Sequence, residues 1–326
     1  MRWIVREGDP KTVVAIVNAA GGDARAVEDG RVFVGRRRVR RGDESLEVGD
    51  EVRIAPPRQA RDVSAEDVRV LHRTRDWLAL DKPAGIPTIP DHGGAKGSLL
   101  AHAARIVKMD ASSVHPTSRL DRDVSGVVVF ALTARAREVA KRARDESRYE
   151  RRYIAIASRA PEPPEGVWAF PIGRAPDPRY RAVHGKNATH AETAYRTVAR
   201  AGSFALLAIA PLTGRTHQIR VHASHAGAPL VGDRVYGDGS RLSLPSGQVY
   251  DVGQIALFAA RVRLEGVLDV WSSRPDERGL REGADPSAAR GPSLGERKLR
   301  DLWTTLGGEA AAWDIAVSCV LGRPSS

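Results

Sequence analysis

Residues 118–132 read SRLDRDVSGVVVFAL and set a cluster of charges directly before an unbroken apolar run. The apolar run from Val127 to Leu132 is rich in β-branched residues and predicts a buried strand. The charged part, with Asp121 and Asp123 among arginines, then forms the loop that leads into this strand. Such a loop is either a solvated turn or an active-site loop whose carboxylate is held by the strand behind it. The rest of the chain decides between the two.

The composition is that of a basic, globular chain. Its 326 residues include 51 Lys and Arg against 40 Asp and Glu, which gives a formal net charge of +11. Such an excess of positive charge favours polyanionic partners, of which nucleic acid is the commonest. An arginine-rich chain can also reflect a GC-rich genome. The length suits about two domains, with a large core in at least one of them.

Cysteine and apolar content predict a cytoplasmic protein. The single cysteine, Cys319, excludes an internal disulfide and a cysteine-based zinc finger. The first ten residues, MRWIVREGDP, carry charges where a signal peptide has its apolar core. No stretch approaches the ~20 apolar residues that a membrane span needs. We therefore expect a cytoplasmic monomer without membrane-spanning segments.

The N-terminal region is predicted to be a small domain followed by a linker. Residues 1–56 combine a short apolar helix with short strands that are joined by Gly and Asp turns, and Val32, Val48 and Val52 are among the predicted core positions. Residues 57–66 have the proline and mixed charge of a linker.

The remainder is predicted to be one large domain with an extension. Residues 67–275 alternate strand-like runs with helical stretches, which indicates an α+β domain. Residues 276–326 begin as a polar connector. They end in a predicted helix whose capping box is formed by Ser293 and Glu296.

The N-terminal region also carries a dense group of arginines on a predicted hairpin. Solvated arginines are common on hairpins, but five within six residues indicate an electrostatic contact surface for RNA. These predicted substrate-binding residues are Arg36, Arg37, Arg38, Arg40 and Arg41.

The sequence lacks the common cofactor signatures. It contains no GxxxxGK[ST] phosphate loop, no dinucleotide-binding GxGxxG after a strand, and no HEXXH. His217, His222 and His225 lie close together, but no carboxylate or thiolate accompanies them at a ligand spacing. The alternation around them instead indicates a strand that runs into a helix. We expect neither a cofactor nor a metal ion.

Four segments carry the most specific patterns. They are LDKPAGIPTIPDHG at residues 80–93, SRLDRDVSG at 118–126, YERRYIAIA at 149–157, and PLTGRTHQIRVHASHAGAPLVGDRVYG at 211–237. In this order they resemble the RluA family of pseudouridine synthases, which isomerise uridine in ribosomal or transfer RNA. The patterns RLDxxxSG and GRTHQIRVHxxxxGxPxxGDxxYG make the resemblance specific. The family usually has His where this chain has Ser118, and Thr where it has Val124.

The resemblance covers roughly residues 67–265 and implies a fold. That fold is α+β, with a mixed, mainly antiparallel central sheet flanked by helices. The N-terminal region resembles the alpha-L RNA-binding motif that is often fused to these synthases, because GRVFVGRRRVRRGD and LEVGDEVRI match part of that motif. The implied partner is ribosomal or transfer RNA.

The resemblance also implies roles for single residues. Asp121 matches the catalytic aspartate, and Arg220 matches the arginine that pairs with it. Tyr153 matches the tyrosine that stacks on the uracil and helps to remove the proton at C5. Arg119 resembles the residue that fills the space left by the displaced uridine, and Ile219 is expected to shape the pocket wall.

The chemistry of this family suits the residues present. The reaction breaks the N1–C1′ bond, turns the uracil and rejoins it through C5, so it is redox-neutral and needs no group donor. It needs a carboxylate near the sugar, as nucleophile or as base, and Asp121 is compatible with either role. A carboxylate withdrawn from water binds a proton unless a cation such as Arg220 holds it ionised.

Two other classes of function remain open at this point. An inactive RNA-binding protein or RNA chaperone could share the fold, but it would not need Asp121, Tyr153 and Arg220 together. An RNA glycosidase would share the carboxylate, and it would release free uracil.

Overall fold

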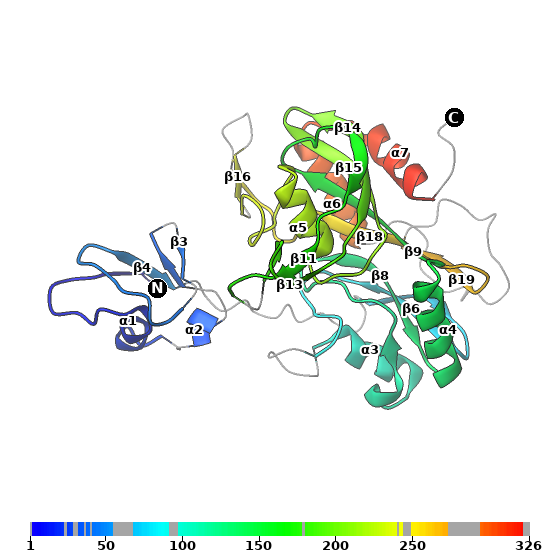
Figure 1. The fold of residues 1–326 in the computed structure, drawn as a ribbon, viewed down its shortest axis with the longest axis horizontal. Coiled ribbons are helices and arrows are strands. Elements are labelled where there is room, and N and C mark those ends of the chain that lie inside the picture. The colour runs from blue at the N-terminus through cyan, green and yellow to red at the C-terminus, as the bar shows by residue number, and fades with distance from the viewer. Residues whose placement is uncertain are drawn as a thin grey trace. The chain divides into compact units, whose positions relative to one another are not determined.

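The computed structural model divides the chain into two compact units, residues 1–61 and 62–326 (Figure 1). Arg36, Arg40, Ser293 and the linker predicted at 57–66 lie outside the residues that the structure describes. The described residues are 2–22, 25–28, 32–35, 37–39, 41–54, 68–90, 97–177, 180–239, 241–243, 249–272 and 294–321.

The N-terminal unit is a four-stranded antiparallel sheet with two helices. In chain order its elements are β1 (Arg2–Ile4), α1 (Val13–Ala19), α2 (Arg25–Glu28), β2 (Val32–Val34), β3 (Arg37–Arg38) and β4 (Glu51–Ile54). The strands lie in the order β1–β4–β2–β3.

The core of this unit confirms most of the predicted apolar positions. Val32 and Val52 are buried in one cluster with side chains of α1. The prediction for Val48 is wrong, because this side chain is 69% exposed. It lies in a turn closed by a hydrogen bond from the Asp50 amide to the Glu47 carbonyl, and a turn of this kind turns its side chains to water.

The second unit is built on a mixed sheet of ten strands. The strands are β5 (Arg69–Arg73), β6 (Trp77–Lys82), β7 (His115–Pro116), β8 (Ser125–Ala131), β9 (Tyr149–Ala157), β10 (Glu165–Trp168), β14 (Thr193–Ala201), β15 (Phe204–Pro211), β18 (Leu257–Leu264) and β19 (Leu268–Trp271). Their order is β10–β14–β15–β9–β18–β8–β6–β5, with β19 beside β18 and β7 beside β8. Only the β8–β18 pair is parallel among these pairings, which confirms the expected mixed, mainly antiparallel α+β fold.

The stretch SRLDRDVSGVVVFAL enters the middle of this sheet. All seven residues of β8 are buried, as the apolar run predicts. Gly126 has a φ of 119°, and a Cβ atom there would lie 2.3 Å from the carbonyl oxygen of Ala259 on β18. Only glycine fits at this position, so the glycine of the SG pair lets the end of the charged loop pass directly against β18.

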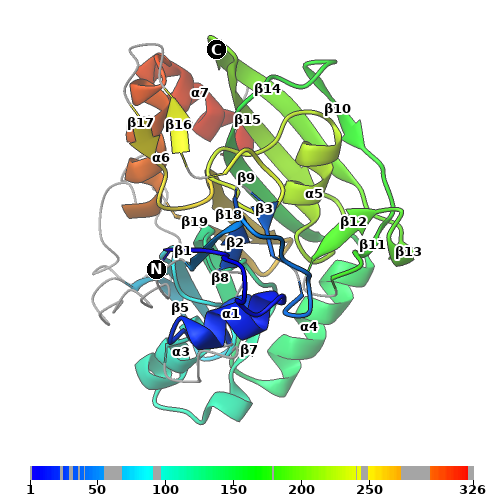
Figure 2. The ribbon, with the colours of Figure 1, turned by 90° about the vertical axis from the view of Figure 1, so that its left-hand side faces the viewer.

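Helices cover both faces of the sheet, and two small sheets accompany it. Figure 2 shows α6 and α7 on one side of β9, β14 and β15, and α5 on the other side. On β6, alternate residues point to opposite faces, so that Leu78 packs with α3 and Trp77 packs with α4. The remaining elements are α3 (Leu99–Val107), a 3₁₀ helix (Ala111–Ser113), α4 (Ala134–Asp145), β11 (Ile172–Arg174), β12 (Arg181–Val183), β13 (Lys186–Thr189), α5 (Gln218–His225), β16 (Arg241–Ser243), β17 (Val249–Asp251), α6 (Leu294–Thr305) and α7 (Ala310–Leu321).

The sequence prediction around the three histidines is half right. The helix exists as α5, but no strand precedes it, because β15 ends at Pro211 and residues 212–217 form turns. This turn is where the GRTH part of the motif lies.

The two C-terminal helices belong to the core of the second unit. Trp303 of α6 and Trp313 of α7 are fully buried in a cluster with Ile154 of β9 and Phe258 of β18. Glu296 is buried and accepts a hydrogen bond of 3.3 Å from the indole N–H of Trp313. The predicted capping box stays a prediction, because Ser293 lies outside the described residues. Within the described part of the chain, no helix is long and apolar enough to cross a membrane.

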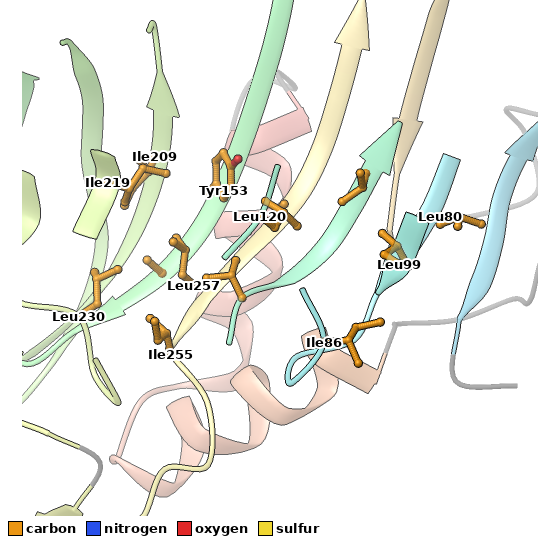
Figure 3. Close-up of a cluster of buried hydrophobic side chains, with 14 of the residues drawn as sticks. Leu80, Ile86, Leu99, Leu120, Tyr153, Ile209, Ile219, Leu230, Ile255 and Leu257 are labelled. Carbon is orange, nitrogen blue, oxygen red and sulfur yellow. The ribbon is translucent and has the colours of Figure 1, made fainter. Parts of the chain in front are cut away.

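The main cluster of buried side chains anchors the charged motifs (Figure 3). Leu120, which precedes Asp121, and Ile219, which precedes Arg220, are both buried in it. Tyr153 is itself a member of the cluster. The core therefore fixes the backbone at all three candidate catalytic positions.

Candidate active site

The four motif segments meet around one pocket of about 1230 Å³. Its walls come from Pro87–Pro90, from the charged loop at 116–121, from the start of β9, and from the turn at 210–217 with the start of α5. Segments up to 130 residues apart in the sequence are thus brought together, as the ordered motifs predict. Asp121, Tyr153 and Arg220 all line the pocket.

Asp121 and Arg220 form an ion pair in this pocket. Nη1 of Arg220 donates a hydrogen bond of 2.6 Å to Oδ2 of Asp121. The Asp121 side chain is 27% exposed, whereas that of Arg220 is only 7% exposed. The carboxylate can therefore meet a substrate while the cation behind it stays shielded from water, where the attraction between the two charges is stronger.

A second carboxylate holds Arg220 from the other side. Asp233 accepts hydrogen bonds from Nε of Arg220 at 2.7 Å and from Nη2 at 2.9 Å. Burial alone would raise the pKa of Asp233, but the bonds from Arg220 outweigh burial and hold the pKa below its ordinary value. Burial alone would likewise lower the pKa of Arg220, and its bonds to Asp233 and Asp121 raise it instead. Arg220 is thus held between two carboxylates, one buried and one at the pocket.

Asp233 is itself fixed by the turn that follows it. The amides of Val235 and Tyr236 donate to its Oδ1 at 2.9 and 3.0 Å. The ring of Tyr236 lies under the guanidinium of Arg220, with 4.9 Å from the guanidinium carbon to the ring centre. The GDxxYG part of the motif thus supplies both the carboxylate and the aromatic ring that hold the guanidinium of Arg220 in place.

His217 completes this wall of the pocket. Its Nδ1 lies 2.8 Å from the hydroxyl of Tyr236, and its Nε2 lies 3.9 Å from Oδ1 of Asp121. Burial lowers the pKa of His217, so the ring is neutral at neutral pH. A neutral imidazole is an ordinary hydrogen-bonding neighbour and adds no positive charge beside Asp121.

Tyr153 faces the pocket from β9. Its hydroxyl forms no hydrogen bond with any described residue, although the side chain is only 6% exposed. Burial raises the pKa of Tyr153 to about 12, so the phenol keeps its proton at neutral pH. A buried hydroxyl that faces a pocket without a protein partner is available to a bound molecule.

The two predicted substrate-binding residues of this unit also line the pocket. Arg119 is exposed and makes no ion pair within the described ranges. Ile219 is buried and forms part of the apolar wall. The lining of the pocket therefore includes an exposed arginine, Arg119, and a buried apolar side chain, Ile219.

The two departures from the family pattern have clear structural positions. Ser118 lies beside Tyr149, whose hydroxyl donates to it at 3.2 Å and also bonds the Thr117 hydroxyl at 2.8 Å. Val124 is buried in the main core cluster, where a methyl group replaces the hydroxyl of a threonine. Both residues line the pocket, so the two departures lie within the site.

The segment at residues 80–93 braces the loop that carries Asp121. The hydroxyl of Thr88 donates to the carbonyl of Leu120 at 2.8 Å and accepts from its amide at 3.0 Å. Lys82 is fully buried, and its ammonium group donates to the carbonyls of Ile86 at 2.7 Å and Arg122 at 3.0 Å. Burial lowers the pKa of Lys82 to about 7, while the nearby charges of Asp123 and Asp121 oppose that shift.

The arginine hairpin of the N-terminal unit is described only in part. Arg37 pairs with Glu44, and Arg41 pairs with Asp43. Both arginines are thus partly neutralised within their own segment. The side chain of Arg38 lies outside the described part, as do Arg36 and Arg40, and an RNA contact by this group stays a prediction.

The three neighbouring histidines have separate partners. His217 contacts Tyr236, His222 bonds the Thr193 hydroxyl and the Phe170 carbonyl, and His225 stacks edge-on against the Phe170 ring. The described residues contain no group of His, Cys, Asp and Glu side chains that could hold a metal ion.

Sequence reasoning named the carboxylate and its cation but missed the residues that hold them. Asp233 and Tyr236 lie within the GDxxYG pattern, and Lys82 and Thr88 lie within the first motif segment. Their presence in the motifs was the available signal. Their roles depend on contacts across the fold, which the spacing along the chain does not reveal.

Comparison with known proteins identifies the class to which this fold and site belong. The family model described as RNA pseudouridylate synthase matches residues 76–225. The chain is 32% identical over 242 residues to the ribosomal large subunit pseudouridine synthase D of Nitrosomonas europaea, a match that covers 70% of each chain. It is 31% identical over 222 residues to the uncharacterized RNA pseudouridine synthase YlyB of Bacillus subtilis, with 65% of this chain and 72% of that protein covered.

A solved structure supports the fold alone. Human RNA pseudouridylate synthase domain containing 1 superposes with a TM-score of 0.52 at 24% identity and covers 76% of this chain and 97% of that chain. The chain is therefore an RNA pseudouridine synthase, an isomerase whose substrate is RNA. Within that class it belongs to the RluA family.

Proposed function

We propose that this synthase isomerises specific uridines of ribosomal RNA, with Asp121 as the residue that acts on the sugar of the target nucleotide. The observation that carries the assignment is the exposed carboxylate of Asp121 at the pocket, paired with the shielded Arg220. Ribosomal RNA is favoured over transfer RNA because the relative from Nitrosomonas europaea is named for the large ribosomal subunit.

Asp121 is suited to break the bond between the sugar and the uracil, because one of its oxygens is bound by Arg220 and the other stays open to the pocket. Its Oδ2 is bound to Arg220, whereas its Oδ1 accepts no hydrogen bond from the described residues. An ionised oxygen that is free on the pocket side can attack C1′ or remove a proton from the sugar, and either event releases N1 of the uracil.

Tyr153 is suited to the last step. After C5 has bonded to C1′, the proton on C5 must leave and N1 must gain one for the ring to become aromatic again. The hydroxyl of Tyr153 faces the pocket without a protein partner, and its neutral form at neutral pH can relay a proton between donor and acceptor. Its ring offers the uracil a stacking surface, which compensates the cost of leaving the RNA stack.

The assignment of Asp121 is tested by Asp121→Asn. An amide keeps the shape of the side chain but can neither attack nor accept a proton, so we expect no pseudouridine, while RNA affinity stays within a few-fold because it comes from many phosphate contacts. The matched control is Asp123→Asn in the same loop, which should retain most activity. Turnover by purified Asp121→Asn would refute the assignment, whereas base release by the wild type would indicate a glycosidase.

The target RNA is tested separately. Pseudouridines would be mapped in total RNA from cells that lack the protein and from cells that carry either the wild type or Asp121→Asn. We expect sites in ribosomal RNA to disappear and to return only with the wild type. Losses confined to transfer RNA would contradict the ribosomal assignment and leave the catalytic one intact.

We further propose that residues 1–56 form an RNA-binding domain of the alpha-L type, joined by a linker at 57–66 to a catalytic domain at 67–275 with its extension at 276–326. The small antiparallel sheet with α1 packed on it and the basic hairpin support this assignment. A cytoplasmic monomer is in keeping with the single cysteine. Removal of residues 1–56 should weaken RNA binding and its salt dependence, and equal slopes with and without them would contradict a contact.

A further inference from the structure

One side of α4 carries a row of unpaired cations. Arg137, Lys141 and Arg144 are spaced four and three residues apart, so they lie on one face of the helix. All three side chains are exposed, and none forms an ion pair with a carboxylate within the described ranges. We call these three residues the basic row.

The contacts of the basic row locate it beside the loop that carries Asp121. The guanidinium of Arg144 donates a hydrogen bond of 2.8 Å to the carbonyl of Thr117, and that of Arg137 lies 3.5 Å from the ring of His115. Both partners belong to the short segment that runs into the charged loop. The basic row therefore follows this segment along its length.

One end of the basic row is the pocket itself. Arg144 lines the pocket, together with Ser147 just beyond the end of α4. Arg137 is seven residues earlier, which is about 10 Å along the helix axis at 1.5 Å per residue. Figure 2 shows α4 on the same side of the second unit as α5 and β12, which carry other lining residues. The basic row thus begins at the pocket with Arg144 and continues along the exposed face of α4 to Arg137.

No carboxylate among the described residues pairs with the basic row or with Arg135 and Arg142 on the opposite face of α4, whereas other arginines of this unit are paired. Arg148, which follows α4, pairs with Glu146, and Arg261 pairs with Asp269. Three cations within two helical turns repel one another, and a polyanion in contact with them would relieve that repulsion.

We propose that the basic row binds the phosphates of the RNA strand next to the target uridine, on the side of the pocket bounded by α4. Arg144 meets the phosphate nearest the flipped nucleotide, and Lys141 and Arg137 meet the following ones. This surface fixes the direction in which the strand leaves the pocket. It extends the contact of the enzyme with RNA beyond the nucleotide that reacts.

The experiment compares two double variants of the full-length protein. Arg137→Gln/Lys141→Gln removes the outer part of the row and leaves Arg144 at the pocket. The control, Arg135→Gln/Arg142→Gln, makes the same change in charge on the same helix, at exposed positions roughly 140° away around the axis. Neither control residue has an ion-pair partner among the described residues, so the two pairs differ only in where they point.

The readout is the salt dependence of binding to a labelled single-stranded uridine-containing RNA of 30 nucleotides, with kcat/KM on deproteinised ribosomal RNA as a second measurement. Each lost phosphate contact lowers the slope of log affinity against log salt by about 0.7 for a single strand. We expect a slope smaller by about 1.4 for the row variant, which is roughly 25-fold weaker binding at 0.1 M salt, and no change for the control. Equal slope changes in both variants would reduce the row to general charge, and an unchanged slope in the row variant would overturn the proposal.

Discussion

A guanidinium has five N–H donors, and Arg220 divides them between two carboxylates. Its Nε and Nη2 are taken by Asp233, which sets the plane of the group. Three N–H groups remain, and of these one on Nη1 bonds Asp121, so Asp121 is paired through a single oxygen. A bidentate pair would have occupied both oxygens of the reactive carboxylate. Asp233 is therefore a positioning residue that leaves Asp121 half free.

Replacement of Asp233 tests this arrangement. In Asp233→Asn, the side-chain amide can no longer accept both N–H groups of Arg220, so the guanidinium should turn toward Asp121. We expect kcat to fall about 10²-fold, as small displacements of reacting groups cost that much, while KM for RNA changes little. The assay is tritium release from RNA labelled at uridine C5.

Asp269→Asn supplies the control for this variant. Asp269 holds Arg261 through two hydrogen bonds of 2.8 and 2.6 Å, outside the residues that line the pocket. Both variants lose a bidentate partner, but Asp269 is more exposed than Asp233, so kcat is compared under conditions in which both variants are fully folded. A comparable loss of kcat in Asp269→Asn would show that the effect of Asp233 is only structural.

Tyr153→Phe separates the ring from the hydroxyl. Because the hydroxyl has no partner among the described residues, its loss should leave the melting temperature within a few degrees, whereas turnover should fall ~10²–10⁴-fold. Tyr149→Phe is the contrasting variant, since it loses bonds to Thr117 and Ser118 and should be less stable. Full activity in Tyr153→Phe would limit that residue to stacking.

The sequence predicted the candidate catalytic residues and not the residues that hold them, for a physical reason. Asp121, Tyr153 and Arg220 were predicted because a motif preserves residue type and spacing along the chain. Asp233 acts on Arg220 through the packing of a turn against α5, and its orientation exists only in three dimensions. Its function could not be derived from the letters GD.

At the scale of elements, the loop that carries Asp121 is held by hydrogen bonds from the end of β6 and the loop that follows it. Lys82 and Thr88 bond five backbone groups of the two loops, including those of Leu120 and Arg122 on either side of Asp121. A loop has no ladder of its own hydrogen bonds, so its backbone groups need partners from elsewhere. The DKPAGIPT segment supplies them.

Lys82→Met should loosen this brace. It leaves the carbonyls of Pro83, Ile86 and Arg122 without their donor, at a cost of about 1–3 kcal/mol for each buried group that stays unpaired. We expect a lower free energy of unfolding by denaturant and a lower kcat. Lys186→Met on exposed β13 is the control, and equal stability of the two variants would contradict the bracing role.

Strands were easier to predict than their neighbours. The apolar run at Val127–Leu132 predicted β8, because a strand that is buried on both faces leaves a continuous apolar signal in the sequence. The parallel contact of β8 with β18 joins Ser125 to Phe258, and no local pattern encodes a partner so distant. The helix α7 was also missed, since its nearly continuous apolar sequence lacks helical periodicity.

At the scale of the whole molecule, buried histidines couple stability to pH. Burial lowers the pKa of His102, His217 and His222 below the ordinary value of about 6.5 that holds in the unfolded chain. The unfolded chain therefore binds more protons between pH 6.5 and the lower folded values. It follows that the free energy of unfolding decreases as pH falls through this window, by up to about 1.4 kcal/mol per pH unit for each histidine.

His222 gives the clearest test of this dependence. Its Nε2 must donate to the Phe170 carbonyl and its Nδ1 must accept from the Thr193 hydroxyl, an arrangement that only the neutral ring can make. Denaturant unfolding at pH 7.5, 6.5 and 5.5 should show a smaller decrease for His222→Gln than for the wild type. The exposed His184→Gln should behave like the wild type, and parallel curves for all three proteins would contradict the assignment.

The strand β9 ties the end of the chain to the reacting residues in an order that has a consequence during synthesis. Tyr153 faces the pocket, while Ile154 and Ile156 face α6 and α7. Translation at ≈ 5–20 residues per second delivers α7 roughly 10–30 s after β9. During that interval Ile154 and Ile156 lack their contacts with α6 and α7, so the strand that carries Tyr153 is packed less completely. We therefore expect the pocket to reach its stable form late in synthesis, well after the first unit with its arginines has been made.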